Sequence, residues 1–419
     1  MNPSPACSLQ LTARCQMSPE LIEHPADFLE LCEHIRQCGV VAFDTEFVSD
    51  VGYRPELGLL QFATRDRVAA VDPLAMPSLG PWWELMADDR TTVVVHGGQA
   101  EIRFCIQRSG RIPRRLVDIQ VAEGLRGRSY PLAYNAIVER VLGRTLSSNQ
   151  TRSDWLRRPL SREQLRYALD DVSHVLEIWD RQSQWLKTRR RDGWAEAEFE
   201  RICREIHEDE RVPPWERISG AHRLSRRDLA ILQLLATWRE RIAAELNKPP
   251  RRILRDDLIL DLAKRRPVTV QQALATRDLN RPEYRRRLPE IVDVVAEALR
   301  IPDDDLPPRL RPRDDSASDD QIISRLLGLA LGNICAELEI AQSLVGTSRE
   351  LTELVRAVRG GETAQGAETG LPLLLSGWRG EVCGDILRRV LDGRMCFRVA
   401  SGNSATPLVF EDVPERKSR

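Results

Sequence analysis

Short apolar runs bounded by turn residues fill the first 110 residues of the chain. Such runs, rich in Val, Phe and Leu, are typical of buried or half-buried strands. A Gly-Gly turn at 97–98 follows the last run, and the next residues have the apolar spacing of a helix, over 99–109. The predicted strands span residues 40–48, 57–64, 67–71 and 91–96.

From residue 116 to about residue 210 the apolar spacing is largely helical. Strands that come first and helices that follow predict an α/β domain, in which helices flank a mixed sheet. We place this domain at 18–210. Pro213 and Pro214 mark its end, because consecutive prolines interrupt regular structure.

The rest of the chain is predicted to be mostly helical, in two further units. Leu229, Leu235, Trp238 and Ile242 have helical spacing in the first of them. A stretch rich in Pro and Asp separates the two units and is predicted to be a linker. The predicted boundaries are 217–300 for the first helical unit, 301–320 for the acidic linker, 321–399 for the second unit and 400–419 for a loose tail.

The composition is that of a folded chain with several domains. Its 419 residues are 42% hydrophobic, which is enough to build cores. The sequence has no run of about 18 apolar residues and no secretory signal pattern near its start, so we predict no membrane span and a cytoplasmic location. Nine scattered cysteines without a C-x-x-C pair argue against a disulfide framework or a zinc site and favour reduced thiols.

The formal net charge of −1 hides a segregation of charge along the chain. Residues 1–100 hold 6 basic and 14 acidic side chains, whereas residues 101–170 hold 14 basic and 7 acidic ones. Residues 251–300 are also basic, with 12 basic and 8 acidic side chains. An acidic cluster beside a basic surface suits a metal site that acts on a phosphate backbone, although ordinary solvated charge gives the same sums.

Two carboxylates in the first predicted strand form the strongest chemical signal. Side chains alternate along a strand, so Asp44 and Glu46 project from the same face. Two such charges repel one another unless a cation lies between them, and a hard cation such as Mg²⁺ prefers oxygen ligands. A solvated strand face is the alternative, but the apolar flanks indicate a buried strand where unpaired acids are costly.

A second polar pair lies on a predicted helix. Tyr167 and Asp171 are four residues apart and therefore share a helical face. A phenol beside a metal-bound carboxylate can position or deprotonate a water molecule. The alternative for Tyr167 is the core position of an amphipathic helix.

These motifs together resemble the ribonuclease D family, whose members are 3′→5′ exoribonucleases of the DEDD class, tyrosine subtype. The resemblance rests on the D-T-E strand, the Y-x-x-x-D helix and the stretch R-S-D-W-L-R-R-P-L at 152–160. The unit at 217–300 resembles an HRDC domain, and the unit at 321–399 resembles a weaker second HRDC-like domain. The resemblance implies a ribonuclease H-like α/β exonuclease domain followed by two all-α HRDC-like domains.

By this resemblance, the catalytic residues are Asp44 and Glu46 in the first exonuclease motif and Tyr167 and Asp171 in the third. In the second motif Glu101 occupies the position of the family Asp, and its extra methylene shifts the carboxylate by about 1 Å. The resemblance implies two divalent cations, Mg²⁺ or Mn²⁺, with Asp44, Glu46, Glu101 and Asp171 as ligands.

The implied substrate is RNA, by resemblance a tRNA precursor with a 3′ extension, and the implied products are 5′-mononucleotides. We expect a monomer. The candidate RNA-binding residues are Arg152, Trp155, Arg157 and Arg158, although a core role for Trp155 explains it equally well. Two alternatives remain open: an RNA-binding protein weakened in catalysis by Glu101, and a 3′→5′ DNA exonuclease.

Overall fold

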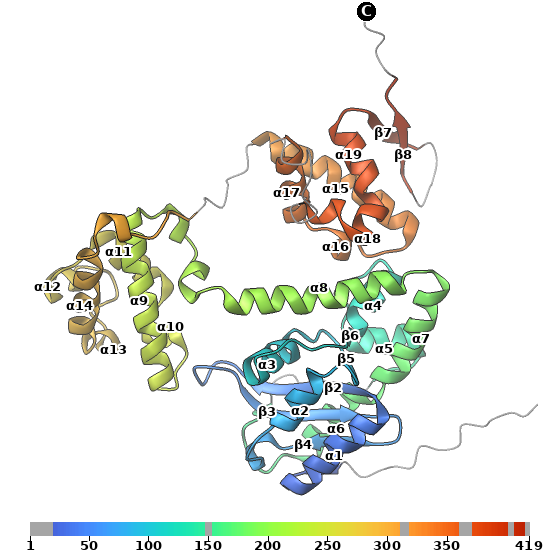
Figure 1. Ribbon diagram of the computed structural model, residues 1–419, viewed down its shortest axis with the longest axis horizontal. Coiled ribbons are helices and arrows are strands. Elements are labelled where there is room, and N and C mark those ends of the chain that lie inside the picture. The colour runs from blue at the N-terminus through green and yellow to red at the C-terminus, as the bar shows by residue number, and fades with distance from the viewer. Residues whose placement is uncertain (1–19, 147–152, 311–317, 360–370, 401–405, 415–419) are drawn as a thin grey trace, which may run out of the picture.

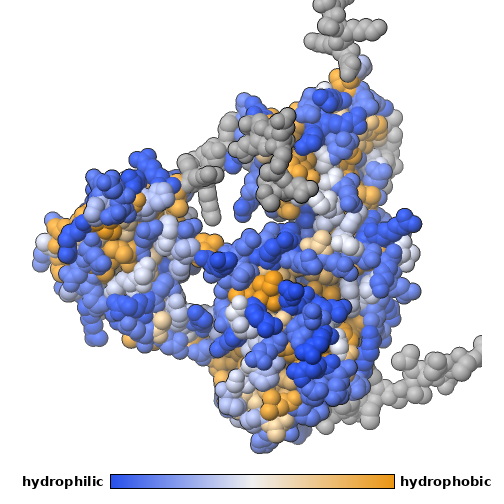
Figure 2. Space-filling view, viewed as in Figure 1, coloured by the Kyte–Doolittle hydropathy of each residue, from blue (hydrophilic) through white to orange (hydrophobic). Residues whose placement is uncertain are grey.

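The computed structural model describes residues 20–146, 153–310, 318–359, 371–400 and 406–414. It has three parts: an N-terminal α/β unit, a middle helical unit and a C-terminal unit (Figure 1). The long helix α8 (Asp192–Arg211) runs along the N-terminal unit toward the middle unit. The face seen in Figure 2 is largely hydrophilic with separate hydrophobic patches, in keeping with a chain whose residues are 30% charged.

The N-terminal unit is built on a six-stranded mixed sheet with the strand order β1-β4-β3-β2-β5-β6. The central strand β2 pairs antiparallel with β3 and parallel with β5. All four predicted strands are present. The strands are β1 (Glu20–Ile22), β2 (Val40–Val48), β3 (Glu56–Ala63), β4 (Val68–Val71), β5 (Thr92–Val95) and β6 (Leu116–Asp118).

Two of the six strands escaped the sequence analysis. The prediction that the chain is helical from residue 116 is wrong for β6, and β1 was not predicted at all. Both strands have three residues, too few to show an alternation of apolar and polar positions. Their pairing with β4 and β5 is a consequence of tertiary contacts.

Helices cover both faces of the sheet (Figure 1). Val41 and Phe43 of β2 pack into the core formed with α1, α2 and α3, whereas Ala42 points into the core formed with α4, α5 and α7. The sheet is therefore buried on both sides. The helices of this unit are α1 (Pro25–Cys38), α2 (Gly80–Met86), α3 (Gln99–Ser109), α4 (Ile119–Arg126), α5 (Tyr134–Leu142), α6 (Arg162–Ser173), α7 (Val175–Thr188) and α8.

The middle unit is all-helical and has its own hydrophobic core, which includes Leu235 and Trp238. It meets the N-terminal unit at the loop after β2, where the backbone N–H of Tyr53 donates to Oδ1 of Asn247 over 3.0 Å. Its helices are α9 (Arg226–Glu245), α10 (Pro250–Ile253), α11 (Asp256–Arg265), α12 (Val270–Leu274), α13 (Pro282–Arg285) and α14 (Leu288–Leu299).

The predicted linker at 301–320 is too long at both ends. Arg227 donates to the backbone oxygen of Ile301 and pairs with Asp303 at 2.5 Å, while Arg226 donates to the backbone oxygen of Leu306 over 2.6 Å. These contacts attach residues 301–306 to the middle unit. Helix α15 (Ser318–Leu338) already begins before residue 320. The composition of this segment predicted a linker. Its backbone is nevertheless bound by Arg226 and Arg227, which lie far from it in sequence.

The C-terminal unit is mostly helical and ends in a hairpin. By length and composition alone, helix α15 is long and apolar enough to cross a membrane. Its Leu327, Leu331 and Ile334 are, however, buried in the core of this unit. The prediction of a loose tail at 400–419 is wrong for residues 408–412, which pair antiparallel with residues 395–399. The other elements are α16 (Gln342–Val345), α17 (Ser348–Arg359), α18 (Gly377–Arg379), α19 (Asp385–Leu391), β7 (Met395–Val399) and β8 (Leu408–Asp412).

A buried ion pair joins the C-terminal unit to α8 of the N-terminal unit. The Arg379 guanidinium binds both carboxylate oxygens of Glu198, at 2.7 and 2.9 Å, and the two side chains are 4% and 0% exposed. Beside this pair the indole of Trp194 stacks on that of Trp378, with ring centroids 5.5 Å apart. The two units therefore share one hydrophobic core rather than touching only at their surfaces.

Candidate active site

The first two catalytic candidates lie on β2, near its C-terminal end. Asp44 pairs in register with Gln61 and Glu46 with Leu59, and a bulge follows Glu46. Alternation along the strand turns Asp44 to the same side as Ala42, away from the layer of α1, α2 and α3. The strand thus presents both carboxylates to the side on which α6 packs.

Helix α6 brings the other pair to the same place. Ser161 and Gln164 form a capping box that sets the start of this helix. One and two turns later come Tyr167 and Asp171, whose side chains lie near enough that each shifts the pKa of the other. The i, i+4 spacing that the sequence indicated therefore places the two side chains together on one face of the helix.

The carboxylates raise one another's pKa. Burial, then repulsion from Glu101, Asp171 and Glu46, holds the pKa of Asp44 well above its usual range. Burial also raises the pKa of Glu46 to about 8, with repulsion from Asp171 and Glu101 adding to it. Burial raises the pKa of Asp171 to about 6, with repulsion from Asp170 adding to the shift and the interaction with the Tyr167 hydroxyl opposing it. Such shifts mark acids gathered in one partly buried place.

Glu101 lies in the first turn of α3 and is 4% exposed. Its Oε1 accepts a hydrogen bond from the Thr45 hydroxyl over 2.5 Å. Thr45 lies between the two catalytic candidates of β2 but projects from the opposite face of the strand. Burial raises the pKa of Glu101 to about 7, and the bond from Thr45 opposes this rise. The sequence analysis missed Thr45, because only the packing of α3 on β2 reveals its partner.

Asp118 and His96 have structural roles near the site. The Asp118 carboxylate accepts backbone N–H groups of Gly97 at 3.0 Å, Gly98 at 3.2 Å and Gln120 at 2.8 Å, so it joins the turn before α3 to the start of α4. The imidazole Nε2 of His96 lies 2.9 Å from the backbone oxygen of Leu132. These hydrogen bonds account for the positions of both side chains without a role in the catalytic cluster.

The predicted stacking of Trp155 on a base is wrong. Trp155 is 5% exposed and packs in a small core with Leu59 and Leu169. Its backbone and Cβ also lie so close to Gly58 that a Cβ there would be 2.7 Å from them. The ring therefore lacks the free face that stacking requires.

Arg158, another candidate for contact with phosphate, already has partners within the fold. Its guanidinium forms two hydrogen bonds with the Asp72 carboxylate, at 2.6 and 2.7 Å, and donates to the backbone oxygens of Gly58 and Trp155. These bonds engage the group that would bind a phosphate. Arg157 is exposed and remains a candidate. Arg152 lies outside the described residues.

The donor set fits hard divalent cations. Carboxylate oxygens are the ligands that Mg²⁺ and Mn²⁺ prefer, and a cation relieves the repulsion that raises the pKa values of these acids. Among the described residues, no three of the four carboxylates have ligand oxygens that all lie within 4.8 Å of one another. Repulsion between carboxylates without a cation favours such a spacing. Asp44, Glu46, Glu101 and Asp171 are the residues available to hold such ions.

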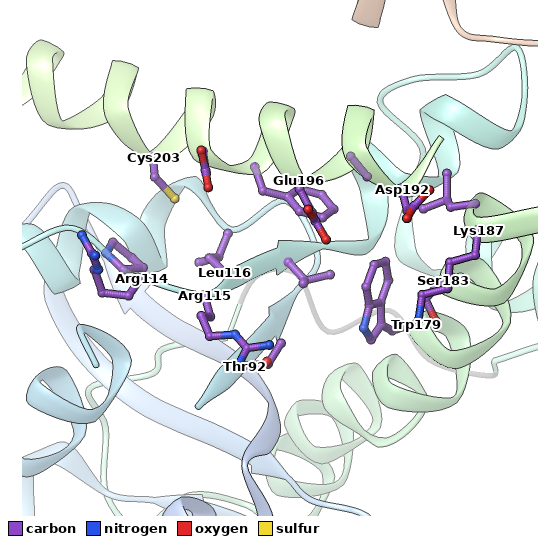
Figure 3. Close-up of a pocket in the computed structure, with 16 residues that line it drawn as sticks. Thr92, Arg114, Arg115, Leu116, Trp179, Ser183, Lys187, Asp192, Glu196 and Cys203 are labelled. Atoms are coloured by element: carbon purple, nitrogen blue, oxygen red, sulfur yellow. The ribbon is translucent and has the colours of Figure 1, made fainter. Parts of the chain in front are cut away.

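A separate cavity of about 410 Å³ lies between β6, α7 and α8 (Figure 3). Trp179, Glu196 and Arg115 line it together with apolar side chains. None of the catalytic candidates is among its lining residues. This cavity is therefore separate from the β2–α6 cluster.

Known proteins resemble the chain over nearly its whole length. The family model for 3′-5′ exonucleases matches residues 19–186, and the HRDC domain model matches residues 228–295. Ribonuclease D of Granulibacter bethesdensis is 31% identical over 385 residues, which cover 91% of this chain and 95% of that protein. The chain belongs to the ribonuclease D family.

Further relatives agree with this assignment. Ribonuclease D of Escherichia coli is 28% identical over 380 residues, covering 90% of this chain and 99% of that protein. The crystal structure of Escherichia coli RNase D, described as an exoribonuclease involved in structured RNA processing, matches with a TM-score of 0.77 and 27% identity over 90% of this chain and 99% of that chain. A protein from Bifidobacterium adolescentis, 22% identical with a TM-score of 0.65, shares the fold.

Membership of the ribonuclease D family confirms the predicted fold class, an exonuclease domain with a mixed sheet flanked by helices followed by a helical HRDC domain. It also confirms the predicted class of enzyme, a 3′→5′ exoribonuclease that hydrolyses phosphodiester bonds. Exonucleases of this kind depend on divalent metal ions, which agrees with the carboxylate cluster.

The raised pKa of Glu46 predicts a pH-dependent stability of the metal-free chain. An acid whose pKa is higher in the folded state stabilises the fold below its unfolded pKa of 4.5, and this contribution is lost as the pH rises through about 8. In a chelator, Glu46→Gln should therefore raise the melting temperature at pH 8.5 by at least about 3 °C and not at pH 4. Thermal denaturation at both pH values measures the difference.

The matched control is Glu163→Gln, a substitution of an exposed acid on α6. It should leave the melting temperature within about 1 °C at both pH values, because surface substitutions have small effects. A gain for Glu46→Gln that is equal at pH 4 and pH 8.5 would contradict the electrostatic origin.

Proposed function

We propose that this chain shortens RNA from its 3′ end and releases 5′-mononucleotides, with two divalent cations, Mg²⁺ or Mn²⁺, in the cluster between β2 and α6. The observation that carries the proposal is the convergence of Asp44 and Glu46 with Tyr167 and Asp171, from segments far apart in sequence. When bound, the two ions would polarise the scissile phosphate and activate a water molecule.

Each side chain has a role in this proposal. Asp44, whose pKa is raised by repulsion from the other three acids, would be a ligand for the ions. Glu46, Asp171 and Glu101 would supply the other carboxylate ligands, Glu101 either directly or through water. Without bound ions, burial and the neighbouring acids raise the pKa of Tyr167. Its hydroxyl would orient the attacking water through a hydrogen bond.

The substrate we infer is a tRNA precursor with a 3′ extension, in the cytoplasm and without a membrane partner, and the enzyme acts as a monomer. The relation to ribonuclease D supports RNA over DNA. Arg157 is exposed, and we infer that its guanidinium binds phosphate of the RNA.

We further infer that residues 321–399, extended by the hairpin to residue 412, form a second HRDC-like domain, beside an exonuclease domain at 18–210 and an HRDC domain at 217–300. Trp378 and Leu387 are buried in its core. Because this second HRDC-like domain shares a hydrophobic core with α8, it stabilises the exonuclease domain.

The proposal is tested with a tRNA precursor labelled at its 5′ end, beside single-stranded DNA of the same sequence. We expect stepwise shortening of the 3′ extension that depends on added Mg²⁺ or Mn²⁺ and stops in a chelator. Binding of the RNA without shortening would favour the weakened RNA-binding protein. Faster shortening of the DNA would favour the DNA exonuclease.

Glu101→Asp is expected to lower the activity, by about tenfold to a hundredfold. The shorter side chain restores the family residue but withdraws its oxygen from the Thr45 hydroxyl, to which Glu101 is bonded at 2.5 Å. A displacement of about 1 Å in a catalytic group can cost about a hundredfold. Initial rates with the labelled precursor, in Mg²⁺ and in Mn²⁺, measure the effect.

Glu101→Gln is the matched substitution, because its amide oxygen can still accept the bond from Thr45 while its charge is lost. Activity loss in both variants means that Glu101 acts through its charge and its position. A gain of activity in Glu101→Asp would instead show that the glutamate degrades the site.

A further inference from the structure

A second cluster of metal-ligand side chains lies apart from the catalytic carboxylates, where α1 packs beside the turn between β3 and β4. His34 and Cys38 are four residues apart on α1 and share a face of that helix. Asp66 projects from the turn that joins the two strands. Among the described residues, this is the one set whose three ligand atoms lie within 4.8 Å of one another.

The distances within this cluster match a tetrahedral metal site. His34 Nε2 lies 3.5 Å from Cys38 Sγ and 3.3 Å from Asp66 Oδ1. Around a tetrahedral Zn²⁺, with bonds of about 2.0 Å to nitrogen and oxygen and about 2.3 Å to sulfur, the N···S separation is about 3.5 Å and the N···O separation about 3.3 Å. Both separations from His34 thus match those of Zn²⁺ ligands, and the ligand atoms of Cys38 and Asp66 lie within 4.8 Å of each other.

Thr64 holds the arrangement in place. Its hydroxyl donates to Asp66 Oδ1 over 2.8 Å and lies 3.1 Å from His34 Nε2. The turn that carries it is closed by the bond from the Thr64 backbone N–H to the oxygen of Arg67, at 2.8 Å. The bond to Asp66 orients that carboxylate, as hydrogen-bond partners of ligating carboxylates do in metal sites.

We propose that His34, Cys38 and Asp66 bind one Zn²⁺ ion. An imidazole, a thiolate and a carboxylate together suit a borderline cation, whereas Mg²⁺ prefers oxygen ligands alone. The side chains of His34 and Asp66 are 22% and 69% exposed, and Cys38 is exposed, so an ion can enter from solvent and water can complete its coordination. The bound ion joins α1 to the β3–β4 turn.

This site is independent of the proposed nuclease chemistry. Its ligands come from α1 and the β3–β4 turn, whereas the catalytic carboxylates come from β2, α3 and α6. The sequence argued against a zinc site because no C-x-x-C pair is present. It could not bring Asp66, which lies 28 residues after Cys38, to the helix.

The test uses Co²⁺ as a spectroscopic substitute for Zn²⁺ in the full-length, reduced chain. A cobalt–thiolate bond gives an absorption band in the near ultraviolet that carboxylate ligands alone do not give, so the band reports this cluster and not the catalytic site. We expect the band to saturate at one equivalent and to disappear on adding Zn²⁺. It should be lost in Cys38→Ser and kept in Cys396→Ser, which changes another exposed cysteine.

Competition with a chromogenic zinc chelator then gives the affinity. His34→Ala and Asp66→Asn should each weaken Zn²⁺ binding at this site at least tenfold, and Thr64→Val should weaken it about tenfold. Asp44→Asn should leave the cobalt–thiolate band unchanged. Absence of the band in the wild type, or its persistence in Cys38→Ser, would overturn the proposal and leave the cluster as a hydrogen-bonded contact between helix and turn.

Discussion

Asp44→Asn is expected to reduce the metal-dependent shortening of RNA by at least about 10³-fold. The substitution keeps the size of the side chain but removes the charge that lies among Glu46, Glu101 and Asp171. Stabilisation of the reacting phosphate by metal ions contributes several kcal/mol, and a loss of about 4 kcal/mol corresponds to about 10³-fold in rate. Single-turnover assays with the labelled precursor measure the effect directly.

The control is Asp50→Asn, which neutralises an exposed acid in the loop after β2. We expect its rate within twofold of the wild type. Binding of the precursor, measured by a gel shift in Ca²⁺, should change much less than the rate in Asp44→Asn, because the arginines and the other acids remain. Full activity of Asp44→Asn would remove Asp44 from the catalytic centre.

Arg379→Met is expected to destabilise the protein by about 3–5 kcal/mol. The substitution leaves the fully buried Glu198 without its bidentate partner and also removes bonds to the backbone oxygens of Leu344 and Val345. An uncompensated buried charge costs far more than a lost surface ion pair. Arg201 still binds Glu198, at 2.6 Å, and limits the loss. Denaturant unfolding of the full chain measures it.

Arg388→Met, an exposed arginine of α19, is the matched control and should change the stability by no more than about 0.5 kcal/mol. The double variant Glu198→Leu with Arg379→Met removes both charges and should recover much of the lost stability. If Arg379→Met alone is as stable as the wild type, the ion pair between Arg379 and Glu198 does not hold the C-terminal unit to α8.

The carboxylates of the candidate site were easy to single out in the sequence because their pattern is local. Alternation along β2 places Asp44 and Glu46 on one side, and the spacing of α6 places Tyr167 and Asp171 on one face. Local periodicity does not say which strand meets which helix. The family resemblance supplied that link, and the packing of α6 on β2 and β3 realises it.

The exposure of the candidate RNA-binding residues was harder to predict, because exposure depends on contacts with distant segments. Trp155 and Arg158 stand in a polar, arginine-rich stretch that looks solvent-exposed in sequence. In the fold, Gly58 of β3 lets Trp155 approach closely, and Asp72 binds the Arg158 guanidinium. Both partners are more than 80 residues away, so no spacing rule could have found them.

By itself the sequence determined the class of fold, the principal strands and the residues of the candidate carboxylate cluster. The reason is that the period of apolar positions and the direction of side chains are set by residues close together in sequence. Tertiary structure alone decided which polar groups are paired. It joined Thr45 to Glu101, Arg379 to Glu198, and Asp66 to the α1 face. The physical reason is that burial and electrostatic pairing depend on segments distant in sequence, whose approach is set by the packing of the whole chain.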